Sequence, residues 1–110
     1  MVTAAGRFYL CARSIARATT RCHMEDMTDE EILWECDIAW DEDQGAHARV
    51  AEHLARELAG MGDNVEAAKH YLVAAEGYEW ASHRVRTDEY REMYRWKSVD
   101  MRVRYARAKA

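Results

Sequence analysis

The histidine, cysteine and glutamate residues of this chain are the types that bind metals, so their spacing is considered first. Glu66 and His70 are four positions apart, as are Glu79 and His83, which places each pair on one face of a helix. A structural zinc site needs four ligands at spacings such as C-x2-4-C with H-x3-5-H, and a di-iron bundle needs E-x-x-H on two helices. Neither pattern occurs, so we expect no metal ligands and no cofactor.

Catalytic patterns are also missing from the sequence. It contains no glycine-rich phosphate loop, no nucleophile elbow and no zincin motif. Cys36 lies among apolar residues at helical spacing (Ile32, Leu33 and Trp40), where a thiol is usually an inert core residue. We therefore expect no catalytic residues and no enzymatic activity.

Basic and aromatic residues alternate near the C-terminus, a composition that suits phosphate contact and base stacking. Three acids, Glu89, Glu92 and Asp100, interrupt this segment. Nucleic-acid binding through residues 84–109 is therefore the alternative function. The residues concerned are Arg91, Arg95, Lys97, Arg102, Arg104 and Arg107, interleaved with Tyr90, Tyr94, Trp96 and Tyr105.

Protein interaction has the stronger support, because four Trp and six Tyr in 110 residues exceed what a small core encloses. Aromatic residues and arginine are enriched at interface centres. We expect an adaptor or modulator that binds a partner protein, or itself, through a helical groove. The candidate partner-binding residues are Trp34, Trp80, Tyr90, Tyr94, Trp96, Arg91 and Arg95.

The elements that must position these residues are all helical. Proline is absent and glycine occurs only five times, while Ala, Glu, Arg, Leu and Met are abundant. Thr28 with Glu31 forms a capping box that starts one helix, which Gly45 ends, and Thr87 caps the last. We predict an all-α bundle of four to five helices without strands. Its later helices cover about residues 46–59, 64–80 and 88–108.

Apolar spacing predicts which face of each helix is buried. In the helix over 46–59 the predicted stripe is Val50, Ala51, Leu54, Leu58 and then Met61. In the helix over 64–80, one stripe of Val65, Ala68, Leu72 and Ala75 and another of Ala67, Tyr71, Ala74 and Tyr78 predict burial over a wide arc. In the last helix the stripe is Met93, Trp96, Val99, Val103 and Ala106, with Tyr90, Tyr94, Met101 and Tyr105 alongside.

Charge is strongly segregated along the chain. Residues 1–23 carry four Arg and no acid, residues 24–82 carry sixteen acids and three bases, and residues 83–110 carry nine bases and four acids. Residues 1–23 are either a basic N-terminal helix or a flexible extension, and residues 24–110 are predicted to form a single domain. No apolar run is long enough to span a membrane, and three cysteines without C-x-x-C spacing argue against a disulfide framework. We expect a cytoplasmic protein. Its high Arg and Ala content suggests a bacterial or phage accessory protein.

Residues 48–81 combine a small-residue pair in one helix, a Gly-Asp turn, and an aromatic and an alanine at fixed spacing in the next helix. These residues are Leu54, Ala55, Leu58, Gly62, Asp63, Asn64, Glu66, Ala67, Tyr71 and Ala74. The pattern resembles a single tetratricopeptide repeat, which implies a close antiparallel hairpin. Ala51 stands where that family has a bulky aromatic, Glu79 where it has a proline, and no second copy follows.

Residues 46–108 are also similar in outline to a microtubule-interacting and transport domain, on the hairpin and on "YRWKSVDM" at 94–101. That family is a three-helix bundle in which the first two helices look like one such repeat. The resemblance implies a groove between residues 64–80 and 88–108 that takes a partner helix.

Overall fold

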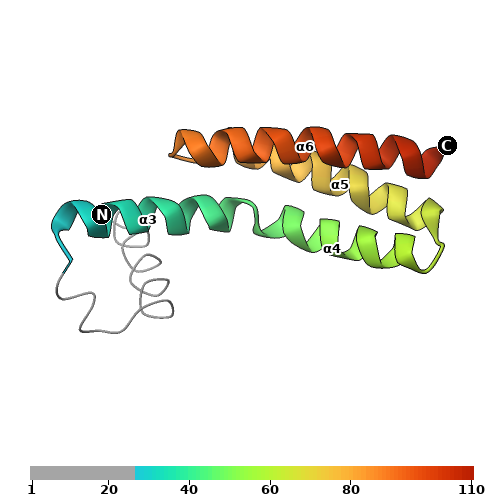
Figure 1. Cartoon of the computed structure of the whole chain (residues 1–110), viewed down its shortest axis with the longest axis horizontal. Coiled ribbons are helices and arrows are strands. Elements are labelled where there is room, and N and C mark those ends of the chain that lie inside the picture. Colours follow the sequence, from blue (N-terminus) through green and yellow to red (C-terminus); the bar gives the residue numbers. More distant parts are fainter. Residues whose placement is uncertain (1–26) are drawn as a thin grey trace. The chain divides into compact units, whose positions relative to one another are not determined.

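The computed structural model describes residues 27–110, which form four α-helices (Figure 1). They are α3 (Asp29–Gln44), α4 (Ala46–Gly60), α5 (Asn64–Ser82) and α6 (Asp88–Lys109). The described part contains no strand, which confirms the predicted all-α class. The prediction for residues 1–23 lies outside the described residues.

The chain divides between Asp43 and Gln44 into two compact units, so α3 is considered by itself. Its predicted capping box is present: the Glu31 amide donates to Thr28 Oγ1 at 3.2 Å, and the Thr28 amide donates to Glu31 Oε1 at 3.3 Å. Cys36 is buried, which agrees with its expected place in the core.

In the second unit, α4 and α5 form an antiparallel hairpin closed by a tight glycine turn. Gly62 has φ of +85°, a left-handed conformation that strongly favours glycine. The Gly62 and Asp63 amides donate to the carbonyls of Ala59 and Leu58, which satisfies the end of α4. Asp63 then accepts from the Glu66 amide at 3.2 Å and caps α5. The turn therefore both ends one helix and begins the next.

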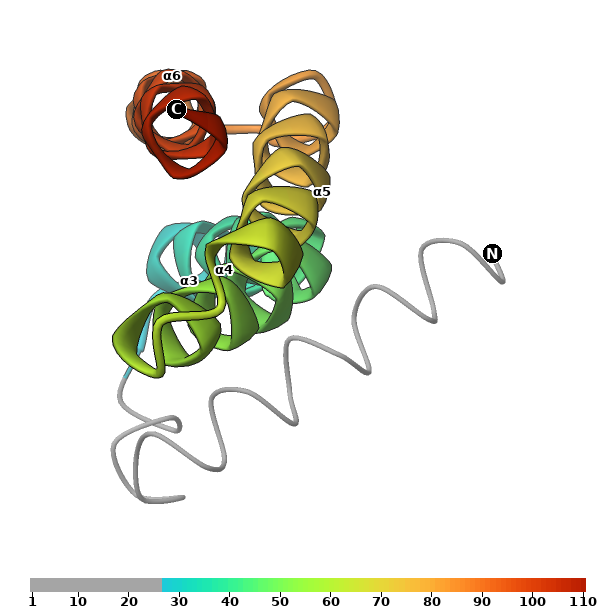
Figure 2. The ribbon, with the colours of Figure 1, turned by 90° about the vertical axis from the view of Figure 1, so that its right-hand side faces the viewer.

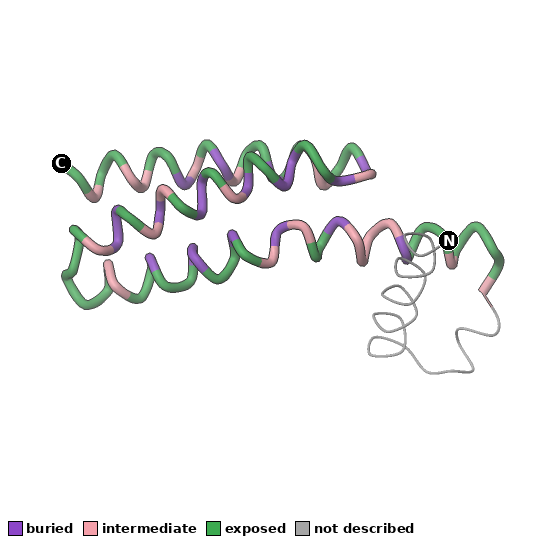
Figure 3. The backbone as a smooth tube through the Cα atoms, turned by 180° about the vertical axis from the view of Figure 1, so that it is seen from behind, coloured by how far each residue is buried: buried purple, intermediate pink, exposed green. Residues whose placement is uncertain are grey.

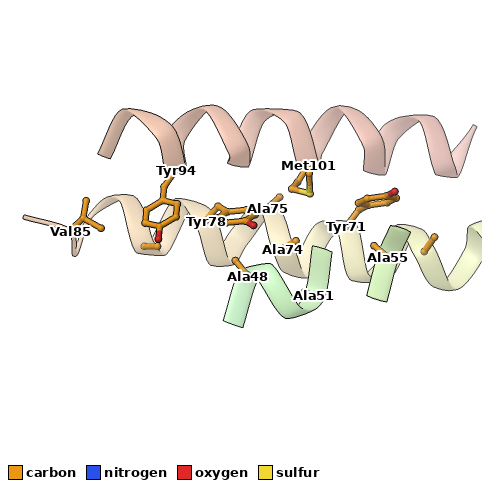
Figure 4. Packing of buried hydrophobic residues seen from close by; sticks show 12 residues of the cluster. Ala48, Ala51, Ala55, Tyr71, Ala74, Ala75, Tyr78, Val85, Tyr94 and Met101 are labelled. Atoms are coloured by element: carbon orange, nitrogen blue, oxygen red, sulfur yellow. The ribbon is translucent and has the colours of Figure 1, made fainter. Parts of the chain in front are cut away.

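Small residues bring α4 close to α5. Ala48, Ala51 and Ala55 of α4 are buried against α5 (Figure 4), and a Cβ added to Gly77 of α5 would lie 3.0 Å from Ala48 Cβ. The predicted stripe on α4 is wrong in part, because Val50, Leu54 and Met61 are exposed. The alanines occupy the inner face because only small side chains fit where the two backbones approach this closely.

The last helix, α6, packs along α5, so that α5 has one neighbour on each side (Figures 1 and 2). Tyr94 and Met101 point from α6 toward α5 (Figure 4) and are fully buried, and Ser98 Oγ donates to the Ala75 carbonyl at 2.9 Å. α5 is buried over a wide arc, as predicted. On α6 the flanking aromatic face is the inner one, so the predicted main stripe is wrong. Its large members are exposed: Met93, Trp96, Val99 and Val103.

Two glycines give opposite expectations for replacement by alanine. A Cβ on Gly45 would lie 2.5 Å from Tyr94 Oη, and the Tyr94 ring is held by stacking on Tyr78 at 5.7 Å between centroids. Gly45→Ala should lower the free energy of unfolding by about 1–3 kcal/mol through overpacking. A Cβ on Gly60 meets nothing within 4 Å, so Gly60→Ala should raise stability by roughly 0.4–1 kcal/mol. Urea unfolding followed by circular dichroism measures the free energy of unfolding of both variants. Equal changes in the two variants would contradict this packing.

Candidate functional site

An apolar groove lies between the first half of α5 and the last turns of α6. It encloses about 400 Å³ and is lined mainly by aliphatic and aromatic side chains. The lining residues are Asn64, Val65, Ala68, Lys69 and Leu72 of α5, and Tyr105, Ala108 and Lys109 of α6. A volume of this size is typical of ligand sites in proteins.

The groove exists because α6 covers the apolar stripe of α5 only in part near the start of α5. Ala68 and Ala75 are buried, Leu72 is half-buried, and Val65 in the first turn of α5 is exposed. α6 runs antiparallel to α5 (Figure 1), and in this region it contributes Tyr105, Ala108 and Lys109 to the lining. The result is uncovered apolar surface at the paired ends of two helices.

Basic side chains flank the apolar lining. Lys69 donates to Glu66 Oε1 at 2.9 Å, and Lys109 Nζ lies 5.3 Å from the centroid of the Tyr105 ring. Further along both helices, Arg102 Nη2 donates to Glu79 Oε1 at 2.9 Å, which joins α6 to α5. The ion pair lies outside the groove, whose lining extends to Leu72 on α5 and to Tyr105 on α6.

A buried polar cluster fixes α6 against the hairpin and so determines the groove walls. The Tyr78 hydroxyl of α5 donates to Glu52 Oε1 of α4 at 2.6 Å, and Lys97 Nζ of α6 donates to the same oxygen at 3.2 Å. Arg56 contacts the other oxygen, Glu52 Oε2, through Nη2 at 2.6 Å and Nε at 2.9 Å. One carboxylate thus binds donors from all three helices.

The same contacts alter the ionisation of both groups. Burial acts to raise the pKa of Glu52, but hydrogen bonds from Tyr78, Arg56 and Lys97 outweigh it, so that this pKa lies below the ordinary value. Burial, then the Glu52 hydrogen bond and charge, raise the pKa of Tyr78. The carboxylate therefore stays ionised and the phenol stays a donor at neutral pH.

The predicted tryptophan contacts all lie at the surface but on different elements. Trp96 of α6 is 70% exposed, Trp80 of α5 is 53% exposed, and Trp34 of α3 is 47% exposed. Arg84 stacks on Trp80, with its guanidinium carbon 4.7 Å from the ring centroid. Because α3 belongs to the other compact unit, Trp34 is not assigned to a common site with the other two.

The tyrosines and arginines predicted as contacts have mixed surroundings. Tyr94 is 1% exposed, and Tyr90 is half-buried with its ring edge-on to Tyr94, 5.8 Å between centroids. Arg91 contacts Asp88 and donates to the Val85 carbonyl at 3.5 Å, whereas Arg95 is exposed. Tyr90 and Tyr94 therefore serve the core, and Arg95 and Trp96 remain at the surface.

None of the residues that line the groove is among the partner-binding residues predicted from the sequence. Val65, Leu72 and Tyr105 were assigned to buried stripes, because their spacing matches that of neighbouring core positions. The sequence feature that indicates the groove is the small size of Ala68 and Ala108, together with the turn that places Val65 at the start of a helix. Apart from Lys109, the lining residues fall in the ranges 64–80 and 88–108.

Among residues 27–110 there is no cluster of three or more His, Cys, Asp or Glu side chains arranged to hold a metal ion. Within that same range, no helix combines the length and apolar character needed to cross a membrane.

No protein-family model, curated protein or solved structure matches this chain. The resemblances to a tetratricopeptide hairpin and to a microtubule-interacting and transport domain therefore stay predictions. The candidate site depends on its geometry alone.

Removing the Tyr78 hydroxyl tests the buried cluster. Tyr78→Phe should lower the free energy of unfolding at pH 7 by about 1.5–3 kcal/mol, because the Glu52 carboxylate loses its shortest donor from α5. The pKa of Glu52 is depressed in the folded state, so this contribution is present above the ordinary pKa of 4.5 and is lost as pH falls through the folded pKa.

Urea titrations of the parent and Tyr78→Phe chains between pH 7 and pH 3 measure this dependence. The difference in stability should shrink below about pH 4.5. A difference that stays constant over the whole range would show that the hydroxyl acts independently of the Glu52 charge.

Proposed function

We propose that this chain is a protein-interaction module that binds an amphipathic helix of a partner protein in the groove between α5 and α6. The observation that carries the proposal is the apolar groove of about 400 Å³ at the paired ends of these helices. A helix laid between two helices extends a bundle by one member, and its apolar face replaces the missing cover over Val65 and Leu72. This role is that of an adaptor or a modulator of the partner protein.

The lining specifies the chemistry of the partner helix. Val65, Leu72 and Tyr105 provide an apolar floor and walls for one or two bulky side chains. Lys69 and Lys109 at the rim favour carboxylates beside those side chains, with Glu66 already neutralising part of this charge. The expected partner segment therefore carries aliphatic or aromatic residues with acidic neighbours.

Nucleic-acid binding has less support from the surface of α6. Four of its bases make ion pairs with acids: Arg91 with Asp88, Lys97 with Glu52, Arg102 with Glu79 and Arg104 with Asp100. Two of its predicted stacking rings, Tyr90 and Tyr94, are half-buried and buried. The helix therefore offers fewer groups for phosphate and base contact than its composition indicates.

A cytoplasmic location and a role as a bacterial or phage accessory protein also remain proposals. The high Arg and Ala content supports the second, and the cysteine spacing without C-x-x-C supports the first.

Two valines on α5 provide a matched test of the groove. Val65 lines it and Val73 does not, although both are exposed, at 71% and 55%. Val65→Glu should abolish stoichiometric capture of a protein partner, since it places a charge on the apolar lining. Val73→Glu should leave capture unchanged. Affinity capture from cells, followed by mass spectrometry and repeated with the purified partner by calorimetry, measures both.

The two variants separate the possible outcomes. Equal loss with both valine variants would contradict a site at the groove. Capture of nucleic acid instead of protein, with an affinity that falls steeply as salt rises, would support the alternative function. Far-ultraviolet circular dichroism of each variant confirms that the helices are intact.

A further inference from the structure

The outer face of α6 carries an apolar row that nothing in the described unit covers. Trp96, Val99 and Val103 are 70%, 62% and 41% exposed. Their spacing of three and four residues keeps them on one side of the helix, opposite Tyr94 and Met101, which are buried against α5. Figure 3 shows exposed residues along the edge of α6 that faces away from α5. This row is the outer seam of α6.

One charged residue lies at each end of the outer seam. Glu92 lies four residues before Trp96, and Arg107 lies four residues after Val103. Both are exposed, and neither makes an ion pair with another of the described residues. Along the helix, the order is therefore an acid (Glu92), then Trp96, Val99 and Val103, then a base (Arg107).

The order is self-complementary: when a second copy runs in the opposite direction, each acid meets a base and each Trp meets a Val. The midpoint between Glu92 and Arg107 falls between Val99 and Asp100, and so does the midpoint between Trp96 and Val103. Two copies of α6 that run antiparallel about that point bring each Trp96 against the partner's Val103 and each Glu92 beside the partner's Arg107. A parallel arrangement would instead place like charges together. Antiparallel pairing of identical surfaces has the two-fold symmetry of an isologous dimer.

Two other charged residues near the seam are paired within each copy. Asp100 lies near the midpoint and accepts from Arg104 Nε at 3.3 Å. Arg102 contacts Glu79 of α5 at 2.9 Å. The repulsion between the two copies of Asp100, and between the two copies of Arg102, is therefore reduced.

We propose that a second copy of this chain covers the outer seam, so that the protein forms a two-fold dimer through antiparallel α6 helices. Trp96 is the anchor of this interface, and the reciprocal Glu92–Arg107 pairs select the antiparallel direction. The dimer goes beyond the proposed function and uses the opposite side of α6 from Tyr105 and the groove. Both surfaces remain available in one assembly.

Sedimentation equilibrium of the full chain over a range of concentrations tests the dimer. The parent chain should show a reversible monomer–dimer equilibrium. Trp96→Ala should weaken association at least about 30-fold, because a central tryptophan is lost from both sides of the interface. Its helix content should not change, since the side chain is exposed.

Charge reversal tests the direction of pairing. Glu92→Arg and Arg107→Glu should each weaken the dimer by roughly tenfold or more, because each places like charges together twice. The double variant should return the dissociation constant to within about threefold of the parent value, since the pairs are restored with opposite sense. Glu76→Arg, an exposed change of the same kind on α5, should have no effect.

A monomeric parent chain at all concentrations would overturn the proposal. So would a dimer that is insensitive to Trp96→Ala, or single charge reversals that the double variant does not rescue. Val65→Glu should leave the dimer intact. Loss of partner capture with the dimer retained would therefore separate a failure at the groove from a failure at the outer seam.

Discussion

The helical arrangement of the second unit depends on one buried carboxylate. Glu52 of α4 accepts from Tyr78 of α5 and from Lys97 of α6 on the same oxygen, at 2.6 and 3.2 Å. A buried charge is unfavourable unless it is paired and hydrogen-bonded, so this contact requires all three helices to be present in one register. The Tyr78 ring also stacks on Tyr94, which extends the same constraint into the apolar core. Sliding α6 by one turn would leave Glu52 without a donor from that helix.

Close packing of α4 on α5 determines what remains at the surface. Alanines and Gly77 occupy the contact, so the larger aliphatic residues of α4 are displaced to its outer side. The inner face of α6 is filled mainly by tyrosines, methionine and serine, which leaves tryptophan and valines outside. A core built from small residues and aromatic rings therefore accompanies several large apolar residues at the surface. Exposed apolar surface of this kind is common where proteins bind one another.

Much of the fold could be predicted from the sequence, because local signals are strong at helix ends. Thr28, Gly62 and Thr87 each mark a boundary that the structure has, since caps and left-handed turns depend on residues close in sequence. The inner faces were harder to predict. Both Ala51 and Val50 are apolar, and only the distance between helices decides which one is buried. The groove depends on how far α6 covers Val65 and Leu72, which is a tertiary relation that periodicity does not contain.

The groove has one wall made from the end of a helix. Tyr105, Ala108 and Lys109 of α6 lie on one face of that helix and line the groove together. They share this face only while the turn is helical. An occupant that contacts the wall therefore loses affinity by the fraction of time that the turn spends unwound. Residues that strengthen or weaken this turn therefore tune binding without touching the occupant.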